Sequence, residues 1–180
     1  MTIRTTSIRY LISRKIAALR WPHWVAIGTA ATVAIAVSVW ALWPESPRQR
    51  VYLDATACLL TGNQGVTTEP AASVWATLQQ ASVDTLVRAQ TLRVSDPQTP
   101  ENAAGYLASL ATSGCGLIVA VDAGPAAAVD KHAGTFPATP FITVGGGTPA
   151  ANVQVFDPSD TAGIQAAVQT HLEAMADQAS

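Results

Sequence analysis

Apolar residues fill one long stretch near the amino terminus, from Trp24 to Trp43, without a single charged residue. A helix of about 20 residues that rises about 1.5 Å per residue matches a hydrocarbon core about 30 Å thick. Tryptophans stand at both ends, where indole rings favour the two membrane interfaces. The pattern predicts a transmembrane helix over 24–43 in contact with the lipid bilayer, between a flank over 1–23 and a linker over 44–50.

The flank before this stretch contains no acid, and its charged residues are Arg4, Arg9, Arg14, Lys15 and Arg20. Basic residues accumulate on the cytoplasmic side of a membrane. We therefore expect a single-pass protein of the cell membrane with a cytoplasmic amino terminus and with residues 51–180 outside the cytoplasm. The alternatives are a cleaved signal peptide and a buried core helix. Trp43 and Pro44 stand where a small-residue cleavage site is expected, which favours an uncleaved signal anchor.

Beyond the linker, short apolar runs alternate with segments of helical spacing. The predicted strands cover 51–61, 86–94, 117–121, 141–144 and 152–156. Four predicted helices lie between or after them. Strands that alternate with helices through short connections predict an α/β fold with a doubly wound parallel sheet, in the order 2-1-3-4-5.

The apolar positions also rank the strands and place the helix starts. Leu117 to Val121 is apolar at every position, which is typical of a central strand covered on both faces. Leu86 to Val94 is more mixed and is predicted nearer an edge. Thr99 and Pro100 form a good N-cap and first-turn pair. The last helix is expected to be capped by Asp157 or Ser159.

Charge divides the chain into two unlike parts. Residues 51–180 hold three basic residues, Arg88, Arg93 and Lys131, against eleven acids, so their net charge is 3 − 11 = −8. Such a domain is a poor partner for nucleic acid or for an anionic membrane surface. Both cysteines of the chain, Cys58 and Cys115, lie in this part, where an extracytoplasmic location favours a disulfide. Two small buried thiols are the alternative.

Several stretches resemble the BMP (basic membrane protein) family of ABC-transporter substrate-binding proteins. They are ACLLTGNQGV, ASVWATLQQAS and CGLIVAVDAGPAAAVDKHAGTFPATPFITVGG, within a match from Thr56 to about Gly163. Thr61 and Gly65 match the end of the family's first strand and its turn, and Trp75 matches its following helix. The resemblance implies one lobe of a type 1 periplasmic-binding fold and a nucleoside-like small-molecule ligand.

The chain departs from the family pattern at ligand positions. Glu69 to Ala72 replace the family's Ser-Phe-Asn stretch, Gly62 replaces an aspartate after the first strand, and Gly145 replaces the aspartate that ends the fourth. Only one lobe of the two-lobed family is matched.

In an open α/β sheet, ligands gather outside the carboxyl ends of the strands at the switch point, here between the first and third strands. Turn chemistry alone is the alternative explanation for polar residues there. The candidate ligand-binding residues at this rim are Thr61, Asn63, Gln64, Asp96, Asp122, Gly124 and Gly145.

Little in the chain indicates catalysis. No Gly-x-Ser-x-Gly or Walker A pattern occurs, and no cluster has metal-ligand spacing. His132 and His171 fall on or beside apolar helix faces. We expect no enzyme, cofactor or metal. The sequence favours a membrane-anchored extracytoplasmic binding module, and the alternative is a regulatory protein that kept the fold, lost the pocket and meets another cell-envelope protein.

Overall fold

The computed structural model describes Ala34, Val37, Ser38 and residues 50–180. The predicted flank over 1–23 lies outside the described residues. The predicted anchor over 24–43 and linker over 44–50 also lie outside them, apart from those three residues and Arg50. Within the described part of the chain, no helix is long and apolar enough to cross a membrane. The fold is therefore that of residues 50–180.

Five parallel strands form one sheet in the order β2-β1-β3-β4-β5, which confirms the predicted fold class and strand order. β3 is central and buried almost throughout, whereas β2 is an edge strand with mostly exposed side chains. Both placements were predicted from the apolar pattern. The strands are β1 (Thr56–Thr61), β2 (Arg88–Arg93), β3 (Cys115–Val121), β4 (Phe141–Val144) and β5 (Val153–Phe156).

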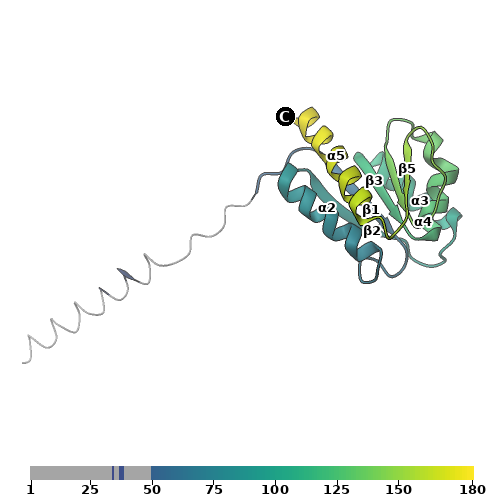
Figure 1. Ribbon diagram of the computed structural model, residues 1–180, viewed down its shortest axis with the longest axis horizontal. Coiled ribbons are helices and arrows are strands. Elements are labelled where there is room, and N and C mark those ends of the chain that lie inside the picture. The colour runs from purple at the N-terminus through teal and green to yellow at the C-terminus, as the bar shows by residue number, and fades with distance from the viewer. Residues whose placement is uncertain (1–33, 35–36, 39–49) are drawn as a thin grey trace, which may run out of the picture. The chain divides into compact units, whose positions relative to one another are not determined.

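Two pairs of helices cover the two faces of the sheet (Figure 1). Helices α2 and α5 pack together on one face, and α3 and α4 pack together on the other. This arrangement buries successive residues of the inner strands on alternate sides, as in a doubly wound fold. The helices are α2 (Ala71–Thr85), α3 (Pro100–Thr112), α4 (Ala123–His132) and α5 (Thr161–Ala179), with a short 3-10 turn η1 (Ala133–Thr135) after α4.

The first residues of β3 depart from regular alternation. Leu117 packs in the core under α2 and α5, yet Cys115, two residues earlier, packs in the core under α3 and α4. The cause is a register shift between β1 and β3 next to Gly116. A β-bulge of this kind re-aims the neighbouring side chain, and here it turns Cys115 to the same face as Cys58.

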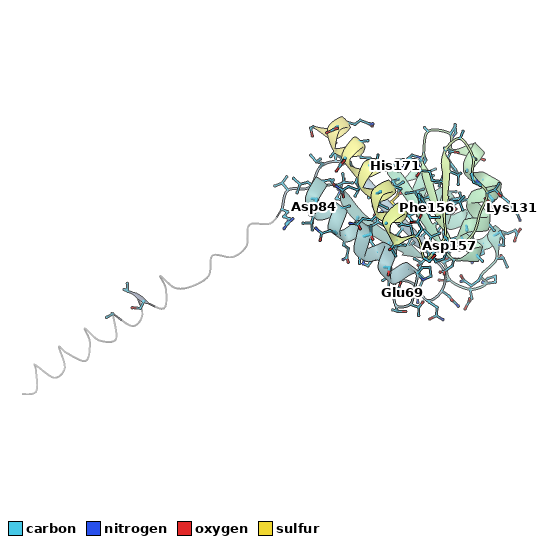
Figure 2. All side chains as sticks on the ribbon, in the orientation of Figure 1. Glu69, Asp84, Lys131, Phe156, Asp157 and His171 are labelled. Carbon is cyan, nitrogen blue, oxygen red and sulfur yellow. A yellow bond between two sulfur atoms is a disulfide. The ribbon has the colours of Figure 1, made fainter. Side chains whose placement is uncertain are left out.

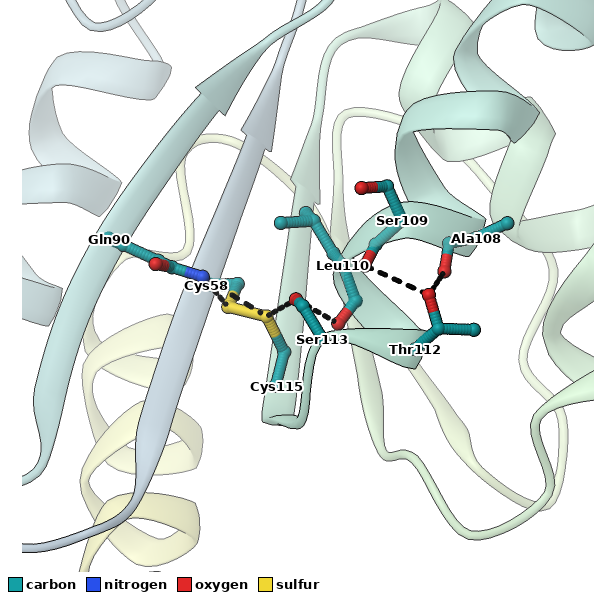
Figure 3. Close-up of a disulfide and its surroundings, with 8 residues drawn as sticks. All are labelled: Cys58, Gln90, Ala108, Ser109, Leu110, Thr112, Ser113 and Cys115. Carbon is teal, nitrogen blue, oxygen red and sulfur yellow. Dashed lines mark hydrogen bonds between the residues drawn. A yellow bond between two sulfur atoms is a disulfide. The ribbon is translucent and has the colours of Figure 1, made fainter.

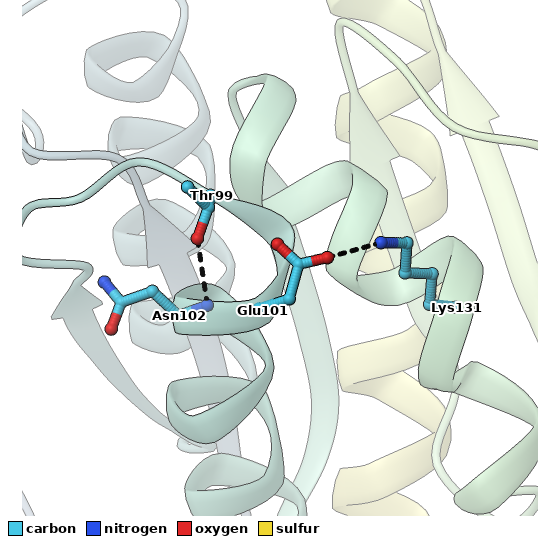
Figure 4. A network of polar contacts seen from close by, with 4 residues as sticks. All are labelled: Thr99, Glu101, Asn102 and Lys131. Atoms are coloured by element: carbon cyan, nitrogen blue, oxygen red, sulfur yellow. Dashed lines mark hydrogen bonds and ion pairs between the residues drawn. The ribbon is translucent and has the colours of Figure 1, made fainter.

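The start of α3 is fixed as predicted, with Thr99 at the N-cap and Pro100 in the first turn. The Thr99 hydroxyl accepts a hydrogen bond from the Asn102 N–H (Figure 4). Nearby, the Lys131 ammonium of α4 donates to Glu101 of α3 at 2.7 Å and holds the pKa of that carboxyl below its ordinary value. Both side chains are exposed, so this ion pair contributes little stability.

The predicted cap of the last helix was wrong. Asp160, and neither Asp157 nor Ser159, caps α5, because its side chain accepts from the Gly163 N–H at 2.9 Å. Asp157 instead accepts from the backbone N–H and the hydroxyl of Ser159 within the preceding turn. These two bonds lower the pKa of the Asp157 carboxyl.

Candidate functional site

The predicted rim lies where the carboxyl ends of β1 and β3 stand side by side. Thr61 is the last residue of β1, and Asp122 follows the last residue of β3 directly. The Asp122 carboxylate accepts a hydrogen bond from the buried Gly62 N–H at 3.0 Å. A side chain at position 62 would meet that carboxylate, since a Cβ there would lie 2.9 Å from its Oδ2 atom. Gly62 therefore allows the close approach of the two loops.

Asp122 has a backbone conformation that is rare for a residue with a side chain, with φ 81° and ψ 157°. This region is populated almost only by glycine and costs about 1 to 3 kcal/mol for other residues. Asp122 also precedes α4 without capping it. The strained backbone directs the carboxylate toward Gly62, away from its own helix.

A second group of polar side chains lies beside the first. The Asn63 side-chain amide donates to Asp96 at 3.1 Å, and the Asn63 backbone N–H donates to Gln98 at 3.1 Å. Gln98 in turn donates to the Val94 carbonyl at 3.0 Å. Arg93 donates to the Asn63 carbonyl at 3.4 Å. The loops after β1 and β2 are thus joined by side chains, and Gln98 was missed from the sequence.

The remaining candidates do not join this network. Gln64 is exposed, and its carbonyl accepts a hydrogen bond from the Thr67 hydroxyl. Gly124 lies inside the first turn of α4, and Gly145 follows β4 with φ 83°. The structure therefore brings Asn63, Asp96 and Asp122 to one rim next to the switch point and leaves Gln64 and Gly145 to either side.

Two buried hydroxyls near this end of the sheet have no hydrogen-bond partner among the described residues, those of Thr61 and Thr143. They belong to β1 and β4. Leu59, Ile142 and Val144 all face α2 and α5. Side chains alternate along a strand, so Thr61, two residues after Leu59, faces α2 and α5 as well. Thr143, between Ile142 and Val144, faces α3 and α4 instead. Because they lie on opposite sides of the sheet, they do not define one site.

One sizeable cavity of the described residues lies away from the rim. An open groove of about 740 Å³ lies near the amino ends of the strands, around the first half of β2. Its walls come from α2, from β2, from the segment before β1 and from the end of α3. The lining residues are Tyr52, Thr56, Trp75, Gln79, Ser82, Val83, Arg88, Ala89, Gln90 and Ser113.

A disulfide joins Cys58 of β1 to Cys115 of β3, as predicted, with Cα atoms 5.9 Å apart (Figure 3). The bridge is buried under α3. Gln90, from the groove, donates to the Cys58 sulfur at 3.0 Å and lies 3.4 Å from the Cys115 sulfur. The disulfide therefore ties the central strand β3 to β1 immediately behind the groove.

The fold does not bring the imidazole of His171 and the ammonium of Lys131 together. His171 lies on α5 and Lys131 on α4, on opposite faces of the sheet (Figure 2). Burial lowers the pKa of the half-buried His171 and so favours its neutral imidazole. Within residues 50–180, no three His, Cys, Asp or Glu side chains gather in a way that suits a metal ion.

We expect the strain at Asp122 to appear in the stability of two variants that both remove its carboxylate. Asp122→Gly should be more stable than Asp122→Ala by about 1 to 2 kcal/mol, because only glycine adopts this conformation freely. Urea denaturation followed by circular dichroism measures the difference. Equal stability of the two variants would show that the backbone at 122 carries no strain.

Comparison with known proteins shows the fold alone. No protein-family model and no curated protein matches this chain. Among solved structures, it is similar to one described as "Crystal structure of putative lipoprotein from Peptoclostridium difficile 630 (fragment)", with a TM-score of 0.57 and 15% sequence identity. The match covers 66% of this chain and 98% of the other. A similar fold thus occurs in another protein of very different sequence.

Proposed function

We propose that this chain is a membrane-anchored extracytoplasmic binding module, similar to the nucleoside-type substrate-binding proteins of ABC transporters. The observation that carries the proposal is the rim. Asn63, Asp96 and Asp122 gather beside the switch point between β1 and β3, where ligands of open α/β sheets bind. The strained backbone at Asp122 supports a functional role, since such strain concentrates at binding sites.

Three further observations support the extracytoplasmic, membrane-anchored part of the proposal. The disulfide suits an oxidising compartment. The uncharged stretch from Trp24 to Trp43 with a basic flank suits a single-pass anchor with its amino terminus inside. The solved structure of similar fold is described as a "putative lipoprotein".

The test is ligand binding by the full chain in detergent. A single rim covers one side of a ligand, whereas ligand pockets bury most of the ligand's surface. We therefore expect a nucleoside panel to give dissociation constants of about 1 mM, or roughly 4 kcal/mol, by calorimetry. Asn63→Ala should weaken binding several-fold, and the control Asn152→Ala, directly before β5 at the opposite, amino-end edge of the sheet, should leave it unchanged.

Tight binding would then need a second rim, supplied by another copy or another protein. Sedimentation of the same samples distinguishes these cases. Absence of nucleoside binding at 10-fold above about 1 mM, in monomers and oligomers alike, would refute the small-molecule proposal.

One specific observation favours a second candidate function: polar groups of the rim are hydrogen-bonded to one another. The Asp122 carboxylate is bonded to Gly62, and the Asn63 amide is bonded to Asp96. The 740 Å³ groove lies at the other end of the strands. We propose as the second candidate a regulatory protein that binds a cell-envelope partner protein and no small ligand.

A further inference from the structure

The free edge of β2 is the part of the domain best suited to a protein partner. β2 ends the sheet, with β1 on its inner side. The Arg88 N–H bonds the Ala55 carbonyl and the Val94 N–H bonds the Thr61 carbonyl, so the even-numbered residues of this strand point their backbone groups inward. Because backbone direction alternates along a strand, Ala89, Thr91 and Arg93 point their N–H and C=O groups outward.

Exposed apolar side chains gather at the amino end of this edge. Tyr52 is 42% exposed and Val83 is 40% exposed, and both line the groove around β2. Val51, 85% exposed, is next to Tyr52 in sequence, and Leu86, 36% exposed, lies three residues after Val83. The Leu53 N–H donates to the Leu86 carbonyl. Apolar surface of this kind, next to unpaired strand groups, is typical of an interaction site.

Charge distinguishes this edge from the rest of the domain. Residues 50–180 carry four basic side chains against eleven acids. Three of the four lie along this edge: Arg88 and Arg93 are the two ends of β2, and Arg50 donates to the Val83 carbonyl beside the groove. Arg88 also forms an exposed ion pair with Asp54 at 2.6 Å, which a partner's carboxylate would have to replace or share. Most basic side chains of this acidic domain therefore follow one of the two edge strands of the sheet, and that strand offers outward backbone groups at Ala89, Thr91 and Arg93.

The same arginines disfavour a second copy as the occupant. Antiparallel pairing of two β2 strands would bring both sets of arginines to one seam, and like charges across a strand pair are destabilising. An extended acidic segment avoids this repulsion, because its carboxylates carry the opposite charge to the arginines. It also gains backbone hydrogen bonds from Ala89, Thr91 and Arg93.

We propose that β2 accepts an extended, acidic segment of a partner protein as a sixth strand, with apolar side chains of that segment in the groove beside Tyr52 and Val83. Strand addition of this kind takes affinity from backbone bonds and selectivity from the side-chain pockets. The inference deepens the second candidate function and rests on it. It does not depend on whether the rim binds nucleosides.

The probe is a capped, dye-labelled peptide of about eight residues that alternates glutamate and valine, with a lysine–valine peptide of the same length as its control. Fluorescence anisotropy with the full chain in detergent should show at least 10-fold tighter binding of the acidic peptide. Affinity should fall as salt rises. Hydrogen exchange should slow at the amides of Ala89, Thr91 and Arg93.

Two variants locate the peptide on the edge. Thr91→Pro removes an outward N–H without removing a bond to β1, and should weaken binding by at least 10-fold, whereas Thr91→Val keeps the N–H and should bind as the parent does. Arg88→Glu with Arg93→Glu should reverse the preference in favour of the lysine peptide. This pair tests the proposal even if Thr91→Pro fails to fold.

Three outcomes would overturn the proposal. These are equal binding of both peptides, no binding of either, and protection of amides elsewhere than on β2. Self-association of the parent chain that Thr91→Pro abolishes would assign the edge to a second copy and would equally refute an acidic partner. None of these results alters the nucleoside titration, so failure of this inference and failure of the rim proposal are distinguishable.

Discussion

Reduction of the Cys58–Cys115 bridge should lower the free energy of unfolding of the domain by about 4 kcal/mol. The two residues are 57 positions apart, and closing a loop of that length removes conformational entropy mainly from the unfolded chain. A domain with about 5 to 15 kcal/mol of stability loses a large share of it by this change. Urea denaturation with and without reductant measures the loss directly.

A double variant separates the bridge from the reductant. Cys58→Ala combined with Cys115→Ala should show the reduced stability in both conditions and no response to reductant. If the parent chain had the same urea midpoint with and without reductant, the bridge would have no role in the stability of the fold.

Truncation of Phe141 should have a comparable effect, with a loss of about 3 to 5 kcal/mol for Phe141→Ala. Phe141 begins β4 and is fully buried, and it is among the largest side chains of the core under α3 and α4. Its removal takes the transfer energy of the ring and leaves a cavity that the sheet and two helices cannot close.

The matched control is Phe156→Ala, at the end of the neighbouring strand β5. Phe156 is only partly buried beside the other core. It should cost clearly less, because exposed surface contributes nothing to the transfer term. The difference between the urea midpoints of the two variants is the measurement. Equal losses of unfolding free energy in both would contradict the full burial of Phe141.

The strand order was predictable because the apolar pattern of each strand indicates how far that strand is buried. Leu117 to Val121 has no polar residue and can only be covered on both faces, whereas Arg88 to Arg93 is polar at both ends and suits an edge. The connections between strands and helices are short, so few arrangements of the parallel strands are possible. The approach of Cys58 to Cys115 followed from that order.

The finer geometry was not predictable from pattern. Gly116 and its register shift turn Cys115 toward Cys58, and no local signal marks a bulge in an apolar run. Gln98 enters the rim from 35 positions beyond Asn63, across a contact that only the folded chain creates. The cap of α5 was placed early, because Asp157, Ser159 and Asp160 are all good capping residues and the turn geometry chooses among them.

The groove beside β2 was missed for the same reason. Tyr52, Trp75 and Gln90 come from three separate segments, and nothing in their spacing brings them together. By contrast, the position of the rim was predictable, because strand ends can be read from the sequence once the strand order is known. The hydrogen bonds between the polar groups of the rim could not be predicted in this way. They favour a protein partner over a small ligand.

Both proposed functions require residues 51–180 to stand outside the cytoplasm, and the thiol state of the chain in cells tests this most directly. Cells that express the full chain are lysed in a denaturant that contains an alkylating reagent, so that buried free thiols also react, and the chain is then reduced and labelled with a second reagent. We expect Cys58 and Cys115 to carry only the second label, because disulfides persist in oxidising compartments. Both cysteines carrying the first label would place the domain in a reducing compartment and contradict the account.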